Sequence, residues 1–127
     1  MLAISGIYVV IIALLAMILG AMVSIHRAKA NISILHGDDM QLAEKMRRHG
    51  NLAETAPFAL LLLIVAEASG GSAMWLHIAG IILVISRLLH PLGLKHENPN
   101  EILRGVGAGG TSISMLISIV LIASNWF

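Results

Sequence analysis

The chain has 127 residues, of which 57% are hydrophobic and only 12% are charged, whereas about a quarter of the residues are charged in an ordinary soluble domain. Its formal net charge of +1 excludes the strongly basic surface that nucleic-acid binding requires, so we expect no nucleic-acid partner. The absence of cysteine excludes disulfides, thiolate metal ligands and a cysteine nucleophile. Any reactive thiol must therefore arrive with a substrate, and we predict no metal site.

Long apolar segments make up most of the chain, and each is about as long as a helix that crosses a bilayer core. They predict an all-α fold, an integral membrane four-helix bundle that forms a single domain over residues 1–127. The first segment has no Lys or Arg before it and is longer than a signal-peptide core, so we expect it to be retained. The predicted spans are residues 2–25, 52–68, 73–94 and 105–127.

The connections between these segments predict the topology. Residues 69–72, with the sequence Ser-Gly-Gly-Ser, are too short for anything but an antiparallel hairpin of the second and third helices. Lys and Arg gather in and beside the other two connections, so the positive-inside rule places these in the cytoplasm and both termini on the non-cytoplasmic side. Trp75 and Trp126 then fall at the outer interface. Short loops and the lack of cysteine are compatible with a bacterial inner membrane.

Local signals predict where helices begin and where they are interrupted. Asp38, with Gln41 three residues later, resembles a capping box at the start of the second helix. Asn98 precedes a proline and is the predicted N-cap of the fourth helix. Pro57 and Pro91 are expected to interrupt the second and third helices, because proline removes a backbone hydrogen bond.

Two charged residues are expected at the same depth inside the membrane. Glu54 lies fifteen residues before Ser69, and Arg87 lies fifteen residues after Ser72, which puts each roughly 22 Å from the outer surface at helical rise. Since a charge in the hydrocarbon is costly, we expect the two side chains to face inward together, and they could form a purely structural ion pair. Glu67, near the outer end, is expected to be solvated.

Helical spacing gathers polar residues into stripes at this depth. Arg47, Asn51 and Glu54 follow one another at i, i+4 and i+7 on the second helix. Arg87 and His90 lie at i and i+3 on the third helix. Together they predict a polar pocket in the cytoplasmic third of the bundle.

Cations from the other two helices are expected at the rim of this pocket. Arg27 follows the first span and Arg104 begins the fourth. Such residues could instead be ordinary topology determinants whose side chains reach lipid headgroups. Further along, Gly105 and Gly109 form a small-residue face suited to close packing against another helix of the bundle or a second subunit.

The segment 47–58, Arg-Arg-His-Gly-Asn-Leu-Ala-Glu-Thr-Ala-Pro-Phe, resembles the signature of the MAPEG family, the membrane-associated proteins in eicosanoid and glutathione metabolism. The similarity extends over the whole chain. It implies a four-helix subunit that forms a homotrimer with glutathione sites between subunits. It also implies a microsomal glutathione transferase-like enzyme, a transferase or peroxidase that uses glutathione as cosubstrate on lipophilic electrophiles.

The resemblance also implies roles for individual residues. Arg104 matches the family's arginine that stabilises the glutathione thiolate, the nucleophilic form of the thiol, and is the predicted catalytic residue. Guanidinium groups suit the two carboxylates of glutathione, and Glu54 suits its ammonium group. The predicted glutathione-binding residues are Arg27, Arg47, Asn51, Glu54, Arg87 and His90.

The chain departs from the family pattern at several positions. Leu94 replaces a tyrosine, Gly105 replaces the serine of the prostaglandin synthase, and Glu44 replaces an arginine found in some members. Prostaglandin-type isomerisation is therefore not expected. Two other functions fit the same fold: a non-catalytic scaffold that binds lipid or a partner, and a small proton-coupled exporter that uses Glu54.

Overall fold

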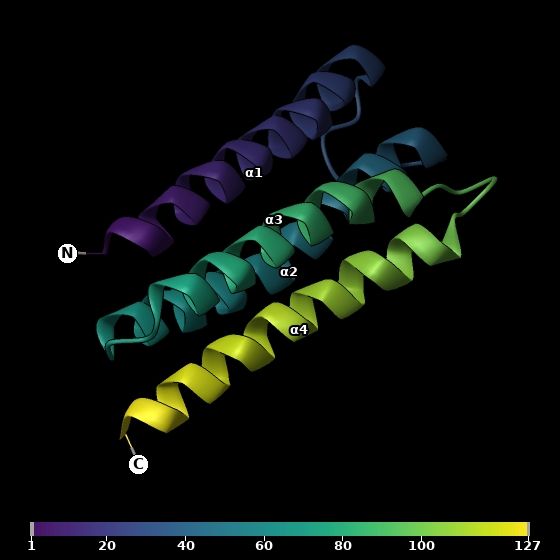
Figure 1. The fold of residues 1–127 in the computed structure, drawn as a ribbon. Helices are drawn as coiled ribbons and strands as arrows, with labels where there is room; N and C mark the ends of the chain where they lie inside the picture. Colours follow the sequence, from purple (N-terminus) through teal and green to yellow (C-terminus); the bar gives the residue numbers. More distant parts are fainter. Residues whose placement is uncertain (1, 127) are drawn as a thin grey trace.

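The computed structural model describes residues 2–126 as helices joined by short connections (Figure 1). Each helix is long and apolar enough to cross a membrane, and no strand occurs in the part of the chain that is described. The predicted all-α architecture with four spans is therefore confirmed. The helices are α1 (Ala3–Ala30), α2 (Met40–Ala68), α3 (Ala73–Gly93) and α4 (Glu101–Trp126).

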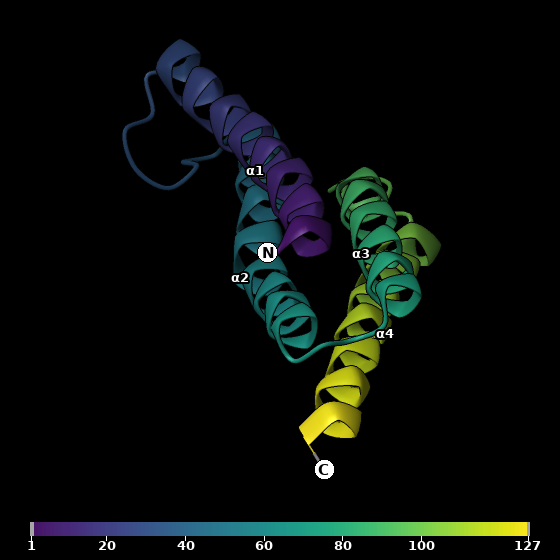
Figure 2. The ribbon, with the colours of Figure 1, turned by 60° about the vertical axis from the view of Figure 1, so that its left-hand side comes forward.

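The helices associate as two pairs, α1 with α2 and α3 with α4, and the α3–α4 contact is the most extensive (Figure 2). Helix α2 also contacts α3 and α4, whereas α1 and α4 do not touch. The start of α1, the end of α4 and the turn at residues 69–72 lie at one end of the bundle, which we call the terminal end (Figure 1). Residues 31–39 and 94–100 lie at the other, which we call the connection end.

Many large apolar side chains lie on the outside of the bundle. Only 17% of the most apolar stretch of α1 is buried within the chain, and the value for α3, the most buried helix, is 39%. Exposed Leu, Ile, Val and Met side chains occur along all four helices. Because water solvates such a surface poorly, these faces require lipid or another subunit.

Small residues bring α3 and α4 into close contact. A Cβ atom built on Gly107 would lie 2.6 Å from the Cβ of His90 and 2.9 Å from the carbonyl oxygen of Ser86. One turn later, a Cβ on Gly110 would overlap the Ser86 hydroxyl. Glycine is therefore required at both positions for α4 to approach the backbone of α3 this closely.

The glycine face predicted for close packing is a different one. Nothing lies within 4 Å of a Cβ built on Gly105 or on Gly109, so these two residues form no close contact within the chain. The contact within the bundle uses Gly107 and Gly110 instead, and the part of the prediction that concerned another helix of the same chain is wrong.

The helix caps lie one or two residues beyond the predicted ones. The Asp39 carboxylate accepts a hydrogen bond from the backbone N–H three residues later (2.9 Å) and caps α2, in place of Asp38. Asn100 caps the start of α4 in the same way (3.1 Å), in place of Asn98. Several polar residues adjoin each helix start, and the one that adopts the extended N-cap conformation depends on the path of the connection.

Asp39 should make the stability of the protein depend on pH. The N–H of Leu42, and then His26, hold the pKa of the Asp39 carboxyl below its ordinary value of 3.8. A group whose pKa falls on folding stabilises the folded state above its unfolded pKa, and the contribution is lost as the pH falls through the folded pKa. Asp39→Ala should therefore unfold more readily than wild type in SDS at neutral pH, and the difference should vanish in acid.

Measurements of SDS unfolding between about pH 3 and pH 7 test this expectation. Asp38→Ala is the matched control, since it removes the neighbouring carboxylate without removing the cap. A constant difference between Asp39→Ala and wild type over the whole range would contradict the assignment of this cap.

The predicted interruptions at Pro57 and Pro91 do not occur. Both prolines lie inside continuous helices, α2 and α3. A transmembrane helix tolerates proline because neighbouring helices and local adjustment compensate for the missing hydrogen bond.

Glu67 is half-buried and hydrogen-bonded, whereas a freely solvated side chain was expected. Its carboxylate accepts hydrogen bonds from the backbone N–H groups of Ile4 (2.9 Å) and Ser5 (2.7 Å) at the start of α1. The first amides of a helix have no partner within the helix and carry a partial positive charge, so a carboxylate on the neighbouring helix stabilises them. Glu67 therefore joins α2 to α1 at the terminal end.

Candidate functional site

Arg87 is the most deeply buried cation of the described chain, with 2% of its surface exposed. Its Nη1 donates to Asn51 Oδ1 (3.1 Å) and to Thr55 Oγ1 (2.8 Å), both on α2. Its Nη2 donates to the carbonyl oxygen of Gly107 on α4 (2.6 Å). One side chain of α3 thus joins three helices inside the bundle.

The partners of Arg87 are neutral oxygen atoms, and no carboxylate lies within ion-pair distance of it among residues 2–126. Glu54 instead accepts a hydrogen bond from Arg47 (3.1 Å), and these side chains are 58% and 59% exposed. The prediction that Glu54 and Arg87 face inward together is wrong. Arg87 forms its hydrogen bonds to α2 with Asn51 and Thr55 instead. Thr55 lies one turn after Asn51 on the same face of α2.

Sequence reasoning missed Thr55, although its position carried a signal. A hydroxyl four residues after Asn51 lies on the same face of a helix, and a buried guanidinium needs several acceptors. The Thr55 hydroxyl also donates to the carbonyl oxygen of Asn51 (2.7 Å), so both of its hydrogen-bonding functions are used.

His90 is buried on α3 one turn after Arg87, and three guanidinium groups contribute to its electrostatic environment. Those of Arg87, Arg104 and Arg47 each lie close enough to the His90 ring to act on it electrostatically. They come from α3, α4 and α2 respectively. Of the predicted site residues, Arg87 thus contacts Asn51, Arg47 contacts Glu54, and the charge of Arg104 acts on His90.

Arg104 lies in the first turns of α4 with its side chain 44% exposed. Its Nη1 donates to the Glu101 carboxylate three residues earlier (2.8 Å), and this carboxylate is 71% exposed. An exposed ion pair of this kind contributes at most about 1 kcal/mol, so a ligand can replace it at little cost.

Arg27 lies apart from the other predicted residues. At the end of α1, its Nη1 donates to the carbonyl oxygen of Ser33 (3.0 Å) and its Nη2 lies 3.4 Å from the sulfur of Met46. None of its hydrogen-bond partners belongs to the predicted site. It holds the start of the 31–39 connection against α2.

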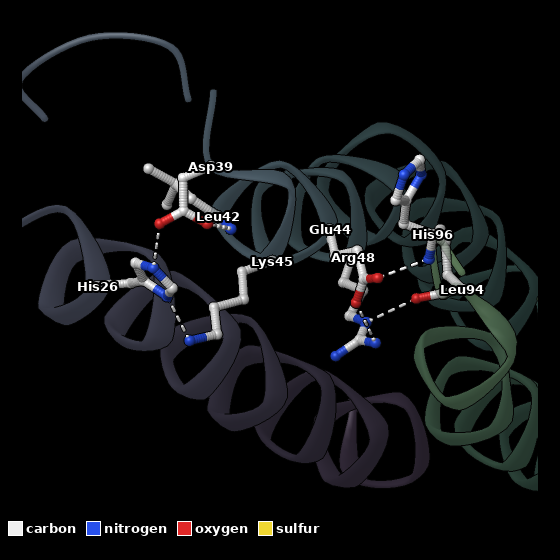
Figure 3. Close-up of polar contacts among 8 residues, drawn as sticks. All are labelled: His26, Asp39, Leu42, Glu44, Lys45, Arg48, Leu94 and His96. Carbon is white, nitrogen blue, oxygen red and sulfur yellow. Dashed lines mark hydrogen bonds and ion pairs between the residues drawn. The ribbon is translucent and has the colours of Figure 1, made fainter. Parts of the chain in front are cut away.

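A chain of polar contacts joins α1 to the start of α2 (Figure 3). His26 Nε2 lies 2.7 Å from the Asp39 carboxylate, and His26 Nδ1 lies 2.6 Å from Lys45 Nζ. With lysine donating to Nδ1, the proton of a neutral ring is on Nε2, which donates to Asp39. The carboxylate that caps α2 is thereby also attached to α1.

A second group of contacts, which the sequence analysis missed, joins α2 to the 94–100 connection (Figure 3). Arg48 Nε donates to the carbonyl oxygen of Leu94 (3.0 Å), and the Glu44 carboxylate accepts from the N–H of His96 (2.5 Å). Glu44 and Arg48 are themselves paired (3.1 Å). We call these two residues the α2 clamp.

Nothing in the described range suggests a metal centre, since no three His, Asp or Glu side chains of residues 2–126 are grouped so as to hold an ion. The candidate site is instead a set of cations and amide or hydroxyl groups. Such a set suits an anionic organic ligand.

Comparison with known proteins identifies the family. The sequence profile of the MAPEG family matches residues 5–124. The chain belongs to the MAPEG family. The match spans all four helices, so the resemblance seen in segment 47–58 extends over the whole bundle of this MAPEG protein.

Two relatives are described as inner membrane proteins. "Inner membrane protein YecN" of Escherichia coli strain K12 is 28% identical over 124 residues, which cover 98% of this chain and 92% of YecN. The YecN protein of Escherichia coli O6:H1 strain CFT073 matches with the same identity and coverage. No solved structure matches this chain. With four apolar spans, this MAPEG protein is a multi-pass integral membrane protein.

Proposed function

We propose that this MAPEG protein is a glutathione-dependent transferase or peroxidase that acts on lipophilic electrophiles, with Arg104 stabilising the glutathione thiolate. The observation that carries the proposal is the network in which Arg87 joins α2, α3 and α4, together with the cations Arg47 and Arg104, whose positive charges act on His90. A cluster of guanidinium groups at one end of a membrane bundle suits an anionic tripeptide, and family membership supports this ligand.

Glutathione carries two carboxylates, an ammonium group and a thiol, and each has a counterpart here. The exposed Arg47–Glu54 pair can separate at little cost, so that Arg47 binds a carboxylate and Glu54 binds the ammonium group. Arg104 would stabilise the thiolate, which attacks an electrophilic carbon. A sulfur–carbon bond forms, and the leaving group departs with the bonding electron pair.

The proposal includes a homotrimer, with glutathione held between subunits and Arg27 contributed at the rim of the site. Arg47, Glu54 and Arg104 lie on faces that no other helix of the same chain covers, so a neighbouring subunit can complete the site. The exposed apolar side chains of α1 leave area for such contacts. The connection end would be cytoplasmic, because the positive-inside rule places the basic connections there and because glutathione would be supplied from that side.

Glutathione titration of the purified protein tests the proposal. We expect saturable binding and a thiolate absorbance near neutral pH, and we expect Arg104→Ala to reduce the thiolate fraction by about tenfold or more. Lys95→Ala is the matched control, because it removes an exposed cation of the neighbouring 94–100 connection and should leave the absorbance unchanged. If the wild-type protein neither bound glutathione nor formed the thiolate, we would abandon the proposal.

A non-catalytic scaffold of the same fold is the second candidate, and one observation favours it. Leu94 has no hydroxyl group, and its only hydrogen bond to a side chain uses its carbonyl oxygen, which accepts from Arg48. If Leu94 leaves the site without a group that turnover needs, a lipid would co-purify and glutathione would bind weakly. The exporter hypothesis gains no support, because Glu54 is exposed and paired with Arg47.

A further inference from the structure

We propose that the α2 clamp, Glu44 and Arg48, positions Arg104 for the stabilisation of the thiolate. This inference rests on the proposed function and extends it to two residues that do not touch the ligand. Neither residue belongs to the set predicted from the sequence. A series of contacts leads from α2 through the 94–100 connection to the first turns of α4.

The clamp holds the connection at two points that lie close together. Arg48 binds the carbonyl oxygen of Leu94, and Glu44 binds the N–H of His96. The clamp side chains are only 19% and 22% exposed, and each holds the other in place. Hydrogen bonds to charged groups are stronger than those between neutral groups, so this attachment resists opening.

Little else attaches the middle of the connection to α2. Residues 95–99 are exposed, and a pocket of about 350 Å³ lies beside the clamp, between the start of α2 and the connection. Lys95 and Asn98 are among the residues that line it. Because no apolar core forms here, the position of the connection depends on the hydrogen bonds from Glu44 and Arg48.

The start of α4 is attached to Gly93, the last residue of α3, which directly precedes the clamped Leu94. The N–H of Asn100 donates to the carbonyl oxygen of Gly93 (3.0 Å), and the N–H of Arg104 donates to the carbonyl oxygen of Asn100 (3.1 Å). A Cβ on Gly93 would lie 2.8 Å from the backbone nitrogen of Arg104. The end of α3 and the first turn of α4 are therefore in direct backbone contact. The backbone of Arg104 is held in place, while its exposed side chain remains free to turn toward a ligand.

The clamp acts through position and not through charge. Glu44 and Arg48 carry opposite charges and form an ion pair, so their net field at a distance is small. Glu44→Ala leaves Arg48 uncompensated, which by charge alone would favour the thiolate and lower the pH midpoint, so a higher midpoint must come from a displaced Arg104. This separates the clamp from residues that bind glutathione directly.

Two measurements on the full-length protein in detergent or lipid nanodiscs test the inference. The first is hydrogen exchange of peptides covering residues 94–103 without glutathione, and the second is the pH midpoint of thiolate formation with glutathione bound. Glu44→Ala should speed exchange in this segment by about tenfold and raise the pH midpoint, with glutathione affinity unchanged within about twofold.

Two further variants make the test specific. Glu97→Ala removes a carboxylate from the same connection, where it forms no side-chain hydrogen bond or ion pair among residues 2–126, and should change neither measurement. Glu44→Gln keeps an oxygen atom that can accept from the His96 N–H, so it should restore much of the exchange protection and move the pH midpoint back toward the wild-type value.

The possible outcomes distinguish the clamp, its role in positioning Arg104 and the proposed function. Unchanged exchange in Glu44→Ala would overturn the clamp itself, whether or not the protein binds glutathione. Faster exchange with an unchanged pH midpoint would overturn the role in positioning Arg104. A wild-type protein without a thiolate would remove the proposed function, and this role with it, although the exchange data would still report the clamp.

Discussion

Gly107→Ala is expected to lower the free energy of unfolding by about 1–3 kcal/mol, the range for overpacking a close contact. The new methyl group would lie 2.6 Å from the Cβ and 2.8 Å from the Cα of His90. Backbone atoms cannot move aside as a flexible side chain can, so α3 and α4 must separate. That separation would also lengthen the bond from Arg87 to the Gly107 carbonyl oxygen, now 2.6 Å.

Gly105→Ala is the matched control for this prediction. The same substitution lies two residues earlier in the same helix, where no atom lies within 4 Å of the added Cβ. Since alanine favours a helix over glycine by about 1 kcal/mol, Gly105→Ala should be neutral or slightly stabilising in SDS unfolding. Equal stability losses in the two variants would contradict the close α3–α4 contact.

Arg87→Ala is expected to destabilise the protein by about 3 kcal/mol or more. The substitution leaves a cavity and removes the donor from three acceptors on α2 and α4, where little water can replace it. It should also reduce glutathione binding, because the helices that carry the site lose their common link. The measurement is SDS unfolding combined with glutathione titration.

Arg47→Ala removes the same kind of side chain near the same end of the bundle. Its guanidinium is 59% exposed and paired only with Glu54, so the stability loss should stay below about 1 kcal/mol, although glutathione affinity should fall. The two variants thus separate a structural arginine from a ligand-binding one. A larger stability loss in Arg47→Ala than in Arg87→Ala would refute the assignment.

The sequence was sufficient to predict the four spans and the α2–α3 hairpin. Both depend on properties that the chain itself carries: the length of each apolar segment and the short Ser-Gly-Gly-Ser turn. These predictions need no knowledge of which faces meet.

The direction in which side chains point around α2 could not be predicted by the same means. At about 100° per residue, Arg47 and Glu54 differ by only about 20° around the helix, whereas Asn51 lies about 40–60° from them on the side of Thr55. The boundary between the inner and outer faces of the helix falls within this gap. A stripe that looks continuous in the sequence is therefore divided in the structure.

The other features that the sequence did not predict are contacts between segments that lie far apart along the chain. Glu67 and Glu44 each bind backbone N–H groups more than fifty residues away. In none of these contacts does the side chain of the partner residue take part, so its type does not indicate the contact. Any residue can supply a backbone amide, so the sequence holds no complementary pattern to find. Only the packing of the helices identifies which carboxylate lies beside which helix end or connection.

The bond between Glu67 and the start of α1 has a consequence for biosynthesis. The amides of Ile4 and Ser5 leave the ribosome first, but their acceptor follows 63 and 62 residues later, near the end of α2. The first helix therefore enters the membrane with its leading amides unsatisfied by this carboxylate. The hydrogen bonds at this end therefore form only after α2, which runs antiparallel to α1, has been added.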